Sequence, residues 1–425
     1  MRLAAALAGA WVGSAALAAD YSFDLAEIEA RPYAFDGFGE ARAEHLRLRE
    51  DAALLPLSFP QESPGDTLNR ATAAFEAGGK FTHGIFTAYA RASGSAATDE
   101  AQTASTGQWL EAGLRASPAP GLVFDLGKQV QRWGKGYAWN PVAFYERPKD
   151  PNDPALSREG FVMASADWVT SLPGTLAAVG FTPVLLPVDD DLNSDFGKHA
   201  HANPGAKLYL LLADTDIDLL WAAEGSRPQR FGFDFSRNLG TQLEVHGEWA
   251  RSLDATRRVL GGDGTVTSEQ RHLDSWLLGA RYLTASEITV LAELYRNGAG
   301  YSQTQLARFY NLLDAAFAAG GGQNLQALAR SLAQAGYGRA NPGRDYAYLR
   351  ISAKDPFDWL YVTPSLNSIV NLDDQSWQLT LELLYTGWQN VELRLRGILT
   401  QGDEATEFGE KPAAQRLELR LRWYF

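Results

Sequence analysis

Three observations predict an all-β chain, an antiparallel transmembrane β-barrel of about eighteen strands. Extended segments of roughly ten residues alternate apolar and polar side chains along much of the chain. The connections between these segments alternate between short turns and mostly longer loops, as short periplasmic turns and long extracellular loops require. After position 19, no apolar run is long enough to be a membrane helix.

The first nineteen residues have the pattern of a secretory signal peptide. Met1-Arg2 is a short basic start, and residues 3–17 are almost entirely apolar or small. Ala16-Leu17-Ala18 places small residues where cleavage needs them. We therefore expect residues 1–19 to be removed and residues 20–425 to form one barrel. A retained anchor helix is the alternative, but the apolar run is short for a membrane span.

The composition limits the classes of partner. A net charge of -13 argues against nucleic acid. The chain contains no cysteine, so an exported form is held together without disulfides. Its 12 tryptophans suit the headgroup layers of a membrane.

The predicted strands follow the alternation along the chain, and an even count returns both ends to the periplasm. They lie near 31–50, 66–77, 79–91, 107–117, 120–129, 161–171, 173–184, 205–214, 215–224, 229–237, 240–252, 270–284, 286–297, 345–354, 356–369, 375–387, 388–400 and 414–425.

The predicted connections fall into two sets. The tight turns include Ala77-Gly78-Gly79, Ser117-Pro118-Ala119-Pro120, Ser171-Leu172-Pro173-Gly174, Asn238-Leu239-Gly240, Thr284-Ala285-Ser286 and Gly387-Trp388-Gln389. The longer connections lie near 51–65, 92–106, 130–160, 185–204, 253–269, 298–344 and 401–413. A soluble all-β protein is the alternative, but it has no reason to sort its connections in this way.

The segment 414–425 has the clearest faces. Leucines and aromatic residues from Leu417 to Phe425 occupy one side of the predicted strand, and charged residues from Arg416 to Arg422 occupy most of the other. This pattern predicts leucines facing lipid and arginines facing water. The aromatic residue Phe425 at the end of this strand resembles the C-terminal pattern of Gram-negative outer-membrane barrels, which insertion machinery recognises. The resemblance implies that this machinery is a partner.

The inward faces of the last two predicted strands and the first are rich in arginine. Closure of the barrel makes these strands neighbours, which predicts a pore-lining cationic wall that attracts anions. The wall comprises Arg47, Arg49, Arg394, Arg396, Arg416, Arg420 and Arg422. The alternative is a structural lattice in which Glu382, Glu392 and Glu418 neutralise the arginines.

The loop 130–160 combines basic, aromatic, glycine and proline residues. Prolines stiffen its backbone, and its aromatic rings need a surface on which to pack. We expect it to fold into the barrel mouth as a constriction that suits a sugar carrying a carboxylate or an aromatic acid. The constriction residues are Arg132, Trp133, Lys135, Tyr137, Trp139 and Arg147. The alternative is an outer loop that packs only on its neighbours.

The chain resembles porin-type and alginate-export-type outer-membrane barrels of Gram-negative bacteria. The resemblance rests on the signal peptide, on Gly127-Lys128-Gln129 followed by Arg132-Trp133-Gly134, on the strand count and on Trp423-Tyr424-Phe425. It implies passive, energy-independent passage of a solute or polymer, through an arginine-lined lumen in the export proteins. It also implies contact with outer-membrane lipid and lipopolysaccharide.

Two other loops have distinct patterns. Apolar residues at helical spacing predict a helical hairpin within 298–344, either partly plugging the pore or covering it without gating. The acidic loop near Asp189-Asp190-Asp191, with His199 and His201, has oxygen groups that suit calcium, but a solvated acidic loop explains it without a metal. We therefore predict no metal site.

We expect an outer-membrane channel for diffusion or export of a polar, anionic solute or polysaccharide. The sequence contains no nucleophile elbow, phosphate loop or HExxH motif, so we predict no enzyme activity and no cofactor. Two alternatives remain: a non-conducting structural or assembly barrel with periplasmic partners, and an outer-membrane lipid-modifying enzyme.

Overall fold

The structure is a computed structural model that describes residues 31–60, 64–154 and 156–425. Within the described residues, the chain from Tyr33 to Phe425 forms one compact unit, here called the second unit because Met1–Pro32 lies outside it. The expected signal peptide at 1–19 lies outside the described residues.

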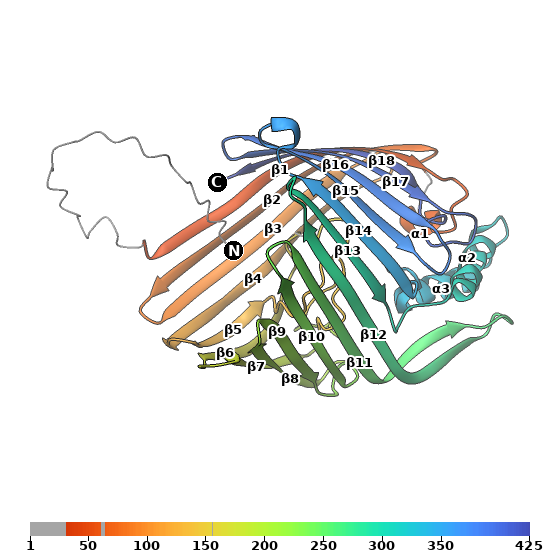
Figure 1. Cartoon of the computed structure of the whole chain (residues 1–425). Helices are drawn as coiled ribbons and strands as arrows, with labels where there is room; N and C mark the ends of the chain where they lie inside the picture. The colour runs from red at the N-terminus through yellow and green to blue at the C-terminus, as the bar shows by residue number, and fades with distance from the viewer. Residues whose placement is uncertain (1–30, 61–63, 155) are drawn as a thin grey trace. The chain divides into compact units, whose positions relative to one another are not determined.

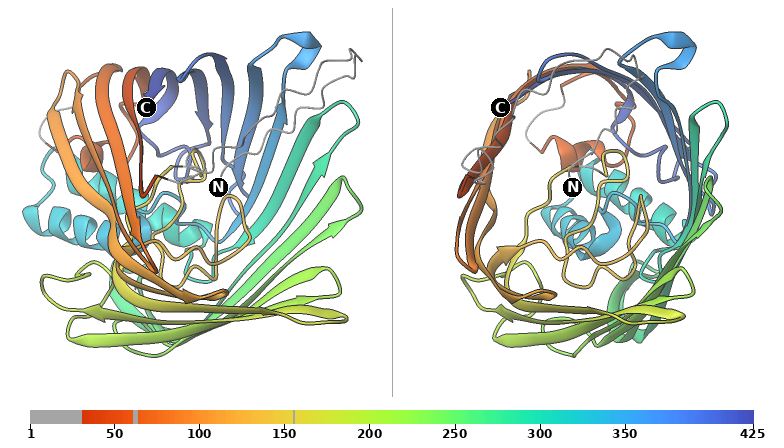
Figure 2. Two further views of the ribbon diagram at one scale, coloured as in Figure 1. Left: turned by 90° about the vertical axis from the view of Figure 1, so that its left-hand side faces the viewer. Right: turned by 60° about the vertical axis from the view of Figure 1, so that its left-hand side comes forward.

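The second unit is a closed barrel of eighteen antiparallel strands, as the sequence predicted (Figure 1). Neighbours in sequence pair along the whole barrel, and β1 closes it by pairing with both β2 and β18 (Figure 2). The strands are β1 (Tyr33–Leu48), β2 (Thr67–His83), β3 (Phe86–Thr98), β4 (Thr103–Ala119), β5 (Leu122–Gln129), β6 (Phe161–Ser171), β7 (Leu176–Val188), β8 (His201–Leu212), β9 (Thr215–Ala222), β10 (Arg230–Leu239), β11 (Leu243–Leu260), β12 (Val266–Leu283), β13 (Ile288–Arg296), β14 (Asp345–Ala353), β15 (Val362–Asn371), β16 (Trp377–Trp388), β17 (Val391–Gln401) and β18 (Ala413–Tyr424).

The two faces of β18 differ as its sequence predicts. Leu417 and Leu419 are about half exposed on the outer surface, whereas Glu418 and Arg420 are buried on the inner face. The apolar side chains of the outer face match a hydrocarbon layer, and the charged side chains line the interior. Alternation of this kind excludes a compact water-soluble core.

The predicted turn at Ala77-Gly78-Gly79 is wrong, because these residues lie inside β2. A Cβ atom on Gly78 would lie 2.7 Å from the guanidinium carbon of Arg91, and one on Gly79 would lie 2.9 Å from the ring of Phe35. The two glycines therefore make room for side chains of the neighbouring strands. The turn lies instead at residues 84–85, between β2 and β3. The predicted long connection at 92–106 is likewise only residues 99–102.

The loop between β13 and β14 contains two helices, as the apolar spacing predicted. These are α2 (Gln303–Phe317) and α3 (Gln323–Leu332), followed by a π-helical turn at Ala333–Tyr337. We call this connection, residues 297–344, the lid. A capping box between Ser302 and Gln305 begins α2.

The lid has its own apolar core. Leu306, Phe309 and Leu313 of α2 are buried with Leu332 of α3, and Ala53 from the loop after β1 joins the same cluster. Short helices also occur at Leu55–Ser58 (α1) and Pro356–Asp358. Among the described residues, no helix is long and apolar enough to cross a membrane.

Candidate functional site

The connection 130–160, here called the inward loop, folds into the interior of the barrel (Figure 2). Buried carboxylates on two strands hold its backbone. Glu248 of β11 accepts hydrogen bonds from the amides of Lys135 and Gly136, both at 2.6 Å. Glu293 of β13 accepts hydrogen bonds from the amides of Tyr137 and Ala138, the latter at 2.9 Å. Charge-assisted bonds of this kind fix the path of the loop.

The glycines of this segment are explained by close approach. A Cβ atom on Gly136 would lie 2.1 Å from the carbonyl oxygen of Trp139, and one on Gly134 would lie 2.7 Å from a carboxylate oxygen of Glu248. Gly134 also has a positive φ of 96°. Only glycine allows the backbone to approach Glu248 this closely.

The aromatic residues of the inward loop pack on the barrel. Trp139 stacks on Tyr295 of β13 with ring centroids 5.0 Å apart, and Tyr137 lies 5.9 Å from Tyr348 of β14. Trp133 is buried against Tyr145 within the loop itself. Of these three predicted constriction residues, only Trp139 lines the cavity that is described below.

The two predicted cations near the start of the loop lie in different environments. Arg132 is exposed. Lys135 reaches β9 and β10, where its ammonium lies 3.1 Å from Asp218 and 3.8 Å from Asp234. Burial alone would lower the pKa of Lys135, but the charges of the two aspartates outweigh it and raise that pKa. Lys135 is therefore an anchor of the loop.

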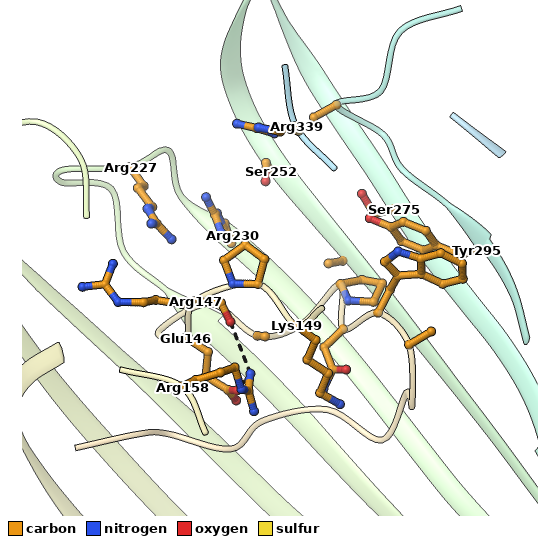
Figure 3. Close-up of a pocket in the computed structure, with 18 of the residues that line it drawn as sticks. Glu146, Arg147, Lys149, Arg158, Arg227, Arg230, Ser252, Ser275, Tyr295 and Arg339 are labelled. Carbon is orange, nitrogen blue, oxygen red and sulfur yellow. Dashed lines mark hydrogen bonds and ion pairs between the residues drawn. The ribbon is translucent and has the colours of Figure 1, made fainter. Parts of the chain in front are cut away.

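A cavity of about 570 Å³ lies between the inward loop, the strands β10 to β13 and the end of the lid (Figure 3). We call it the cationic cavity. Six cationic side chains line it against two carboxylates. The cations are Arg147, Lys149, Arg158, Arg227, Arg230 and Arg339, and the carboxylates are Glu146 and Asp195.

Two of these cations are neutralised by the carboxylates. Arg158 pairs with Glu146 and also donates to the carbonyl oxygen of Arg147 at 3.2 Å (Figure 3). Arg147 pairs with Asp195 and lies 3.2 Å from Glu159. Arg147 was predicted as a constriction residue, and the structure places it in the lining of this cavity.

The other four cations have no carboxylate within 4.0 Å among the described residues. Lys149 donates to the carbonyl oxygen of Gly136 at 2.6 Å. Arg227 lies over the ring of Phe196 at 3.9 Å, and the Nε of Arg230 is buried without a hydrogen-bond partner. Positive charge therefore gathers here without a counter-ion from the described chain.

The pKa values of loop residues reflect this crowding. Burial lowers the pKa of Arg227, and the neighbouring charges of Arg230 and Arg339 lower it further. Burial and the charge of Arg158 lower the pKa of Lys149. A bound anion would reverse both effects, because it stabilises the protonated forms.

The predicted cationic wall is mostly present but is neutralised. Arg394, Arg396, Arg416, Arg420 and Arg422 all face inward. Together with Arg42 these arginines make six, and they contact six carboxylates. These are Glu40, Glu44, Glu382, Glu392, Glu418 and Asp153. The arrangement is that of the balanced lattice left open from the sequence, and it carries little net field.

Two members of the predicted wall lie elsewhere. Arg47 pairs across the barrel seam with Gln415, which shares the outward face of Leu417, so Arg47 is exposed on the outer surface. Arg49 follows the end of β1, and its guanidinium donates to the carbonyl oxygens of Phe408 and Lys411, both at 3.2 Å. Arg47 therefore lies outside the lumen, and Arg49 contacts the backbone of the connection between β17 and β18.

Sequence reasoning missed three of the four unpaired cations. Arg227 belongs to the connection between β9 and β10, Arg230 begins β10, and Arg339 follows the helices of the lid. No local pattern links them, because only the folded loops bring them together. Lys149 could have been found from the sequence, because it lies in the basic, proline-rich part of the inward loop.

The acidic loop after β7 also has a structural explanation. Asp195 pairs with Arg147, and the His199 ring lies 2.7 Å from Asp190. Within the described residues, no group of three or more possible ligands is arranged to hold a metal ion.

Comparisons with known proteins identify the fold. No family model matches the chain, and no curated protein sequence matches it. Among solved structures it is similar to Pseudomonas aeruginosa OccK2 (OpdF) in complex with glucuronate, with a TM-score of 0.53 and 13% identity over 92% of this chain and 98% of that one. It is also similar to P. aeruginosa OpdQ, with a TM-score of 0.52 and 10% identity over 92% and 98% of the two chains.

A third neighbour, P. aeruginosa OccK5 (OpdH), has a TM-score of 0.50 and 13% identity over 92% of this chain and 98% of that one. The chain therefore has the fold of these porin-type outer-membrane barrels: a closed antiparallel barrel with an apolar outer surface. This is the class that the sequence predicted.

Proposed function

We propose that this barrel is a passive channel for small anionic solutes, which are recognised in the cationic cavity. The observation that carries the proposal is the set of four cations without a carboxylate partner, namely Lys149, Arg227, Arg230 and Arg339. Guanidinium groups bind carboxylates through paired, charge-assisted hydrogen bonds. An anion that enters this cavity gains those bonds without having to displace a protein carboxylate.

The cavity also fits a cyclic solute. Its volume of about 570 Å³ lies within the range typical of ligand pockets. Trp139 and Tyr295 form a stacked aromatic pair in its lining, a surface on which a sugar ring or an aromatic acid can pack. The structural neighbour OccK2 was solved in complex with glucuronate, a sugar acid, which supports the choice of a carboxylated sugar as the first solute to test.

A small solute is favoured over a polysaccharide by the contents of the barrel. The inward loop is tied to β11 and β13 through Glu248 and Glu293, so a polymer would have to pass a fixed segment inside the barrel. Contacts with lipopolysaccharide and with the insertion machinery stay predictions.

Single-channel recording in planar bilayers tests the proposal. In a salt gradient, the reversal potential should show anion selectivity, and added glucuronate should reduce the current. Replacing both Arg227 and Arg230 by Gln should lower the anion-to-cation permeability ratio by roughly threefold and weaken the block by glucuronate.

Arg237→Gln is a matched control, because Arg237 lies on the same strand but is exposed at its other end. It should leave both measurements unchanged. Cation selectivity in the native protein, or glucuronate block that survives the double replacement, would reject the proposal. Absence of conductance would favour a structural or assembly barrel.

A further inference from the structure

The inward loop contacts several sides of the barrel interior. Glu248 and Glu293 hold it on β11 and β13, and Lys135 reaches β9 and β10. Farther along the loop, Asp153 binds Arg420 of β18, and Ser157 donates to Glu76 of β2 at 3.0 Å. A segment anchored on these opposite sides divides the interior.

A second cavity, of about 320 Å³, lies between residues 150–153 and 156–157 of the loop and the inner faces of β1 to β4, β17 and β18. No residue lines both this cavity and the cationic cavity. The loop therefore presents residues between 138 and 149, together with Arg158, to the cationic cavity. It presents Asp150, Asn152, Asp153, Leu156 and Ser157 to the second cavity.

The charge of the second cavity differs from that of the first. Five arginines line it, and five carboxylates line it with them. Each of these arginines has a carboxylate within 4.0 Å; for example, Arg422 lies 2.6 Å from Glu40, and Arg416 lies 3.4 Å from Glu44. An entering anion would have to compete with a protein carboxylate for every guanidinium, so this cavity offers anions little gain.

The remaining polar lining consists of hydroxyl and amide groups. Ser95 of β3 and Thr106 of β4 lie opposite each other, with their hydroxyl oxygens 2.9 Å apart. Thr72 of β2 has a buried hydroxyl without a hydrogen-bond partner. Hydroxyl and amide groups both donate and accept hydrogen bonds. An ion pair offers the same combination, because its arginine donates and its carboxylate accepts. A solute that carries many hydroxyl groups and no net charge matches this lining.

We propose that the inward loop divides the channel into two passages, and that the second cavity is a binding site on a separate route for neutral, polyhydroxylated solutes such as sugars. The proposal rests on the proposed function only in taking the barrel to be an open channel. Anions cross the barrel through the cationic cavity, and neutral sugars cross it through the second cavity.

The absence of cysteine from the chain allows a test on folded protein. Ser95→Cys places one thiol in the second cavity, and Ser252→Cys places one in the cationic cavity. Each is labelled after folding with a bulky neutral maleimide, and complete labelling is verified by mass spectrometry. The unlabelled variant shows that the substitution itself permits folding. Labelled Ala96→Cys is the matched control, because Ala96 follows Ser95 but points to the outer surface.

Liposome swelling then measures the uptake of a neutral disaccharide and of glucuronate in parallel. The label at position 95 should slow disaccharide uptake by roughly fivefold and leave glucuronate uptake unchanged, and the label at position 252 should do the reverse. The label at position 96 should change neither rate.

Two results would overturn the two-passage proposal. If each label slows both solutes, the cavities lie in series on one route. If the label at position 95 slows neither, the second cavity is not on a route at all. Disaccharide uptake that is blocked at position 95 in a protein that excludes glucuronate would support the second passage while rejecting the anion channel, so the two proposals fail separately.

Discussion

Asp153 of the inward loop accepts a hydrogen bond of 3.1 Å from Arg420 of β18, 267 positions away in the sequence. The same carboxylate oxygen lies 3.5 Å from Arg396 and 3.8 Å from Arg394 on β17. One loop residue thus neutralises part of the face that would otherwise be the cationic wall. We therefore expect the position of this loop, as well as the strands, to affect ion selectivity.

Asp153→Asn should increase anion selectivity. The change keeps the size of the side chain but removes a negative charge from among three arginines, so the interior becomes more positive. We expect a shift of the anion-to-cation permeability ratio of roughly twofold, measured by reversal potentials. Asp189→Asn, in an exposed loop, is the control for loss of one charge. An unchanged ratio would mean that the arginines do not face the permeating ions.

The same aspartate makes the loop sensitive to strong acid. Burial alone would raise the pKa of Asp153, but the charges of Arg396, Arg420 and Arg394 outweigh it and hold the pKa below its ordinary value of 3.8. The ion pairs therefore stabilise the loop above pH 3.8, and this stabilisation is lost as the pH falls through the lowered pKa.

Current noise recorded between pH 6 and pH 2.5 should stay constant until the pH is below 3.8 and then rise as the loop loosens. Asp153→Asn should abolish that part of the pH dependence, because it has no proton to take up. A rise in noise that begins well above pH 3.8, and persists in the variant, would assign the acid response to another group.

Gly136→Ala should displace the inward loop. Its Cβ atom would lie 2.1 Å from the carbonyl oxygen of Trp139 and 3.2 Å from Glu248, so the backbone must move. We expect the bonds to Glu248 to weaken and single-channel current to become heterogeneous. Gly397→Ala is the control, since nothing lies within 4 Å of its added Cβ. Uniform currents equal to the native level would show that the loop tolerates the methyl group.

The sequence predicted what depends on local periodicity. The leucines and arginines of β18 alternate in the expected way because a strand has a side-chain period of two. Phe309 and Leu313 indicated α2 because residues at this spacing lie on one face of a helix. Where the spacing of side chains within one segment decides its structure, the sequence of that segment is enough to predict it.

The errors arise where distant segments meet. Gly78 and Gly79 have the composition of a turn, but they accommodate Arg91 and Phe35 from neighbouring strands. The neutralisation of Arg420 by Asp153 and the convergence of Arg227 with Arg339 join segments far apart in the chain. A single sequence contains no signal for such contacts, so sequence reasoning did not bring Arg227, Arg230 and Arg339 together.

The barrel closes between β1 and the end of β18. Gly37 of β1 and Phe425 exchange two backbone hydrogen bonds, at 3.2 Å and 3.0 Å. The Phe425 ring covers Gly37, and a Cβ atom there would lie 2.6 Å from the ring and 2.5 Å from the carbonyl oxygen of Glu76. Gly37→Ala should therefore destabilise the seam by about 1–3 kcal/mol, the usual cost of overpacking.

The measurement is the temperature at which the barrel unfolds in detergent, followed by its altered migration on gels. Gly39→Ala is the matched control: it lies two residues along the same strand and nothing lies within 4 Å of its added Cβ. That change should be neutral or slightly stabilising, because it restricts only the unfolded chain. Equal unfolding temperatures for the two variants would mean that the Phe425 ring does not rest on Gly37. In that case, removing the ring with Phe425→Ala should also leave the seam unchanged.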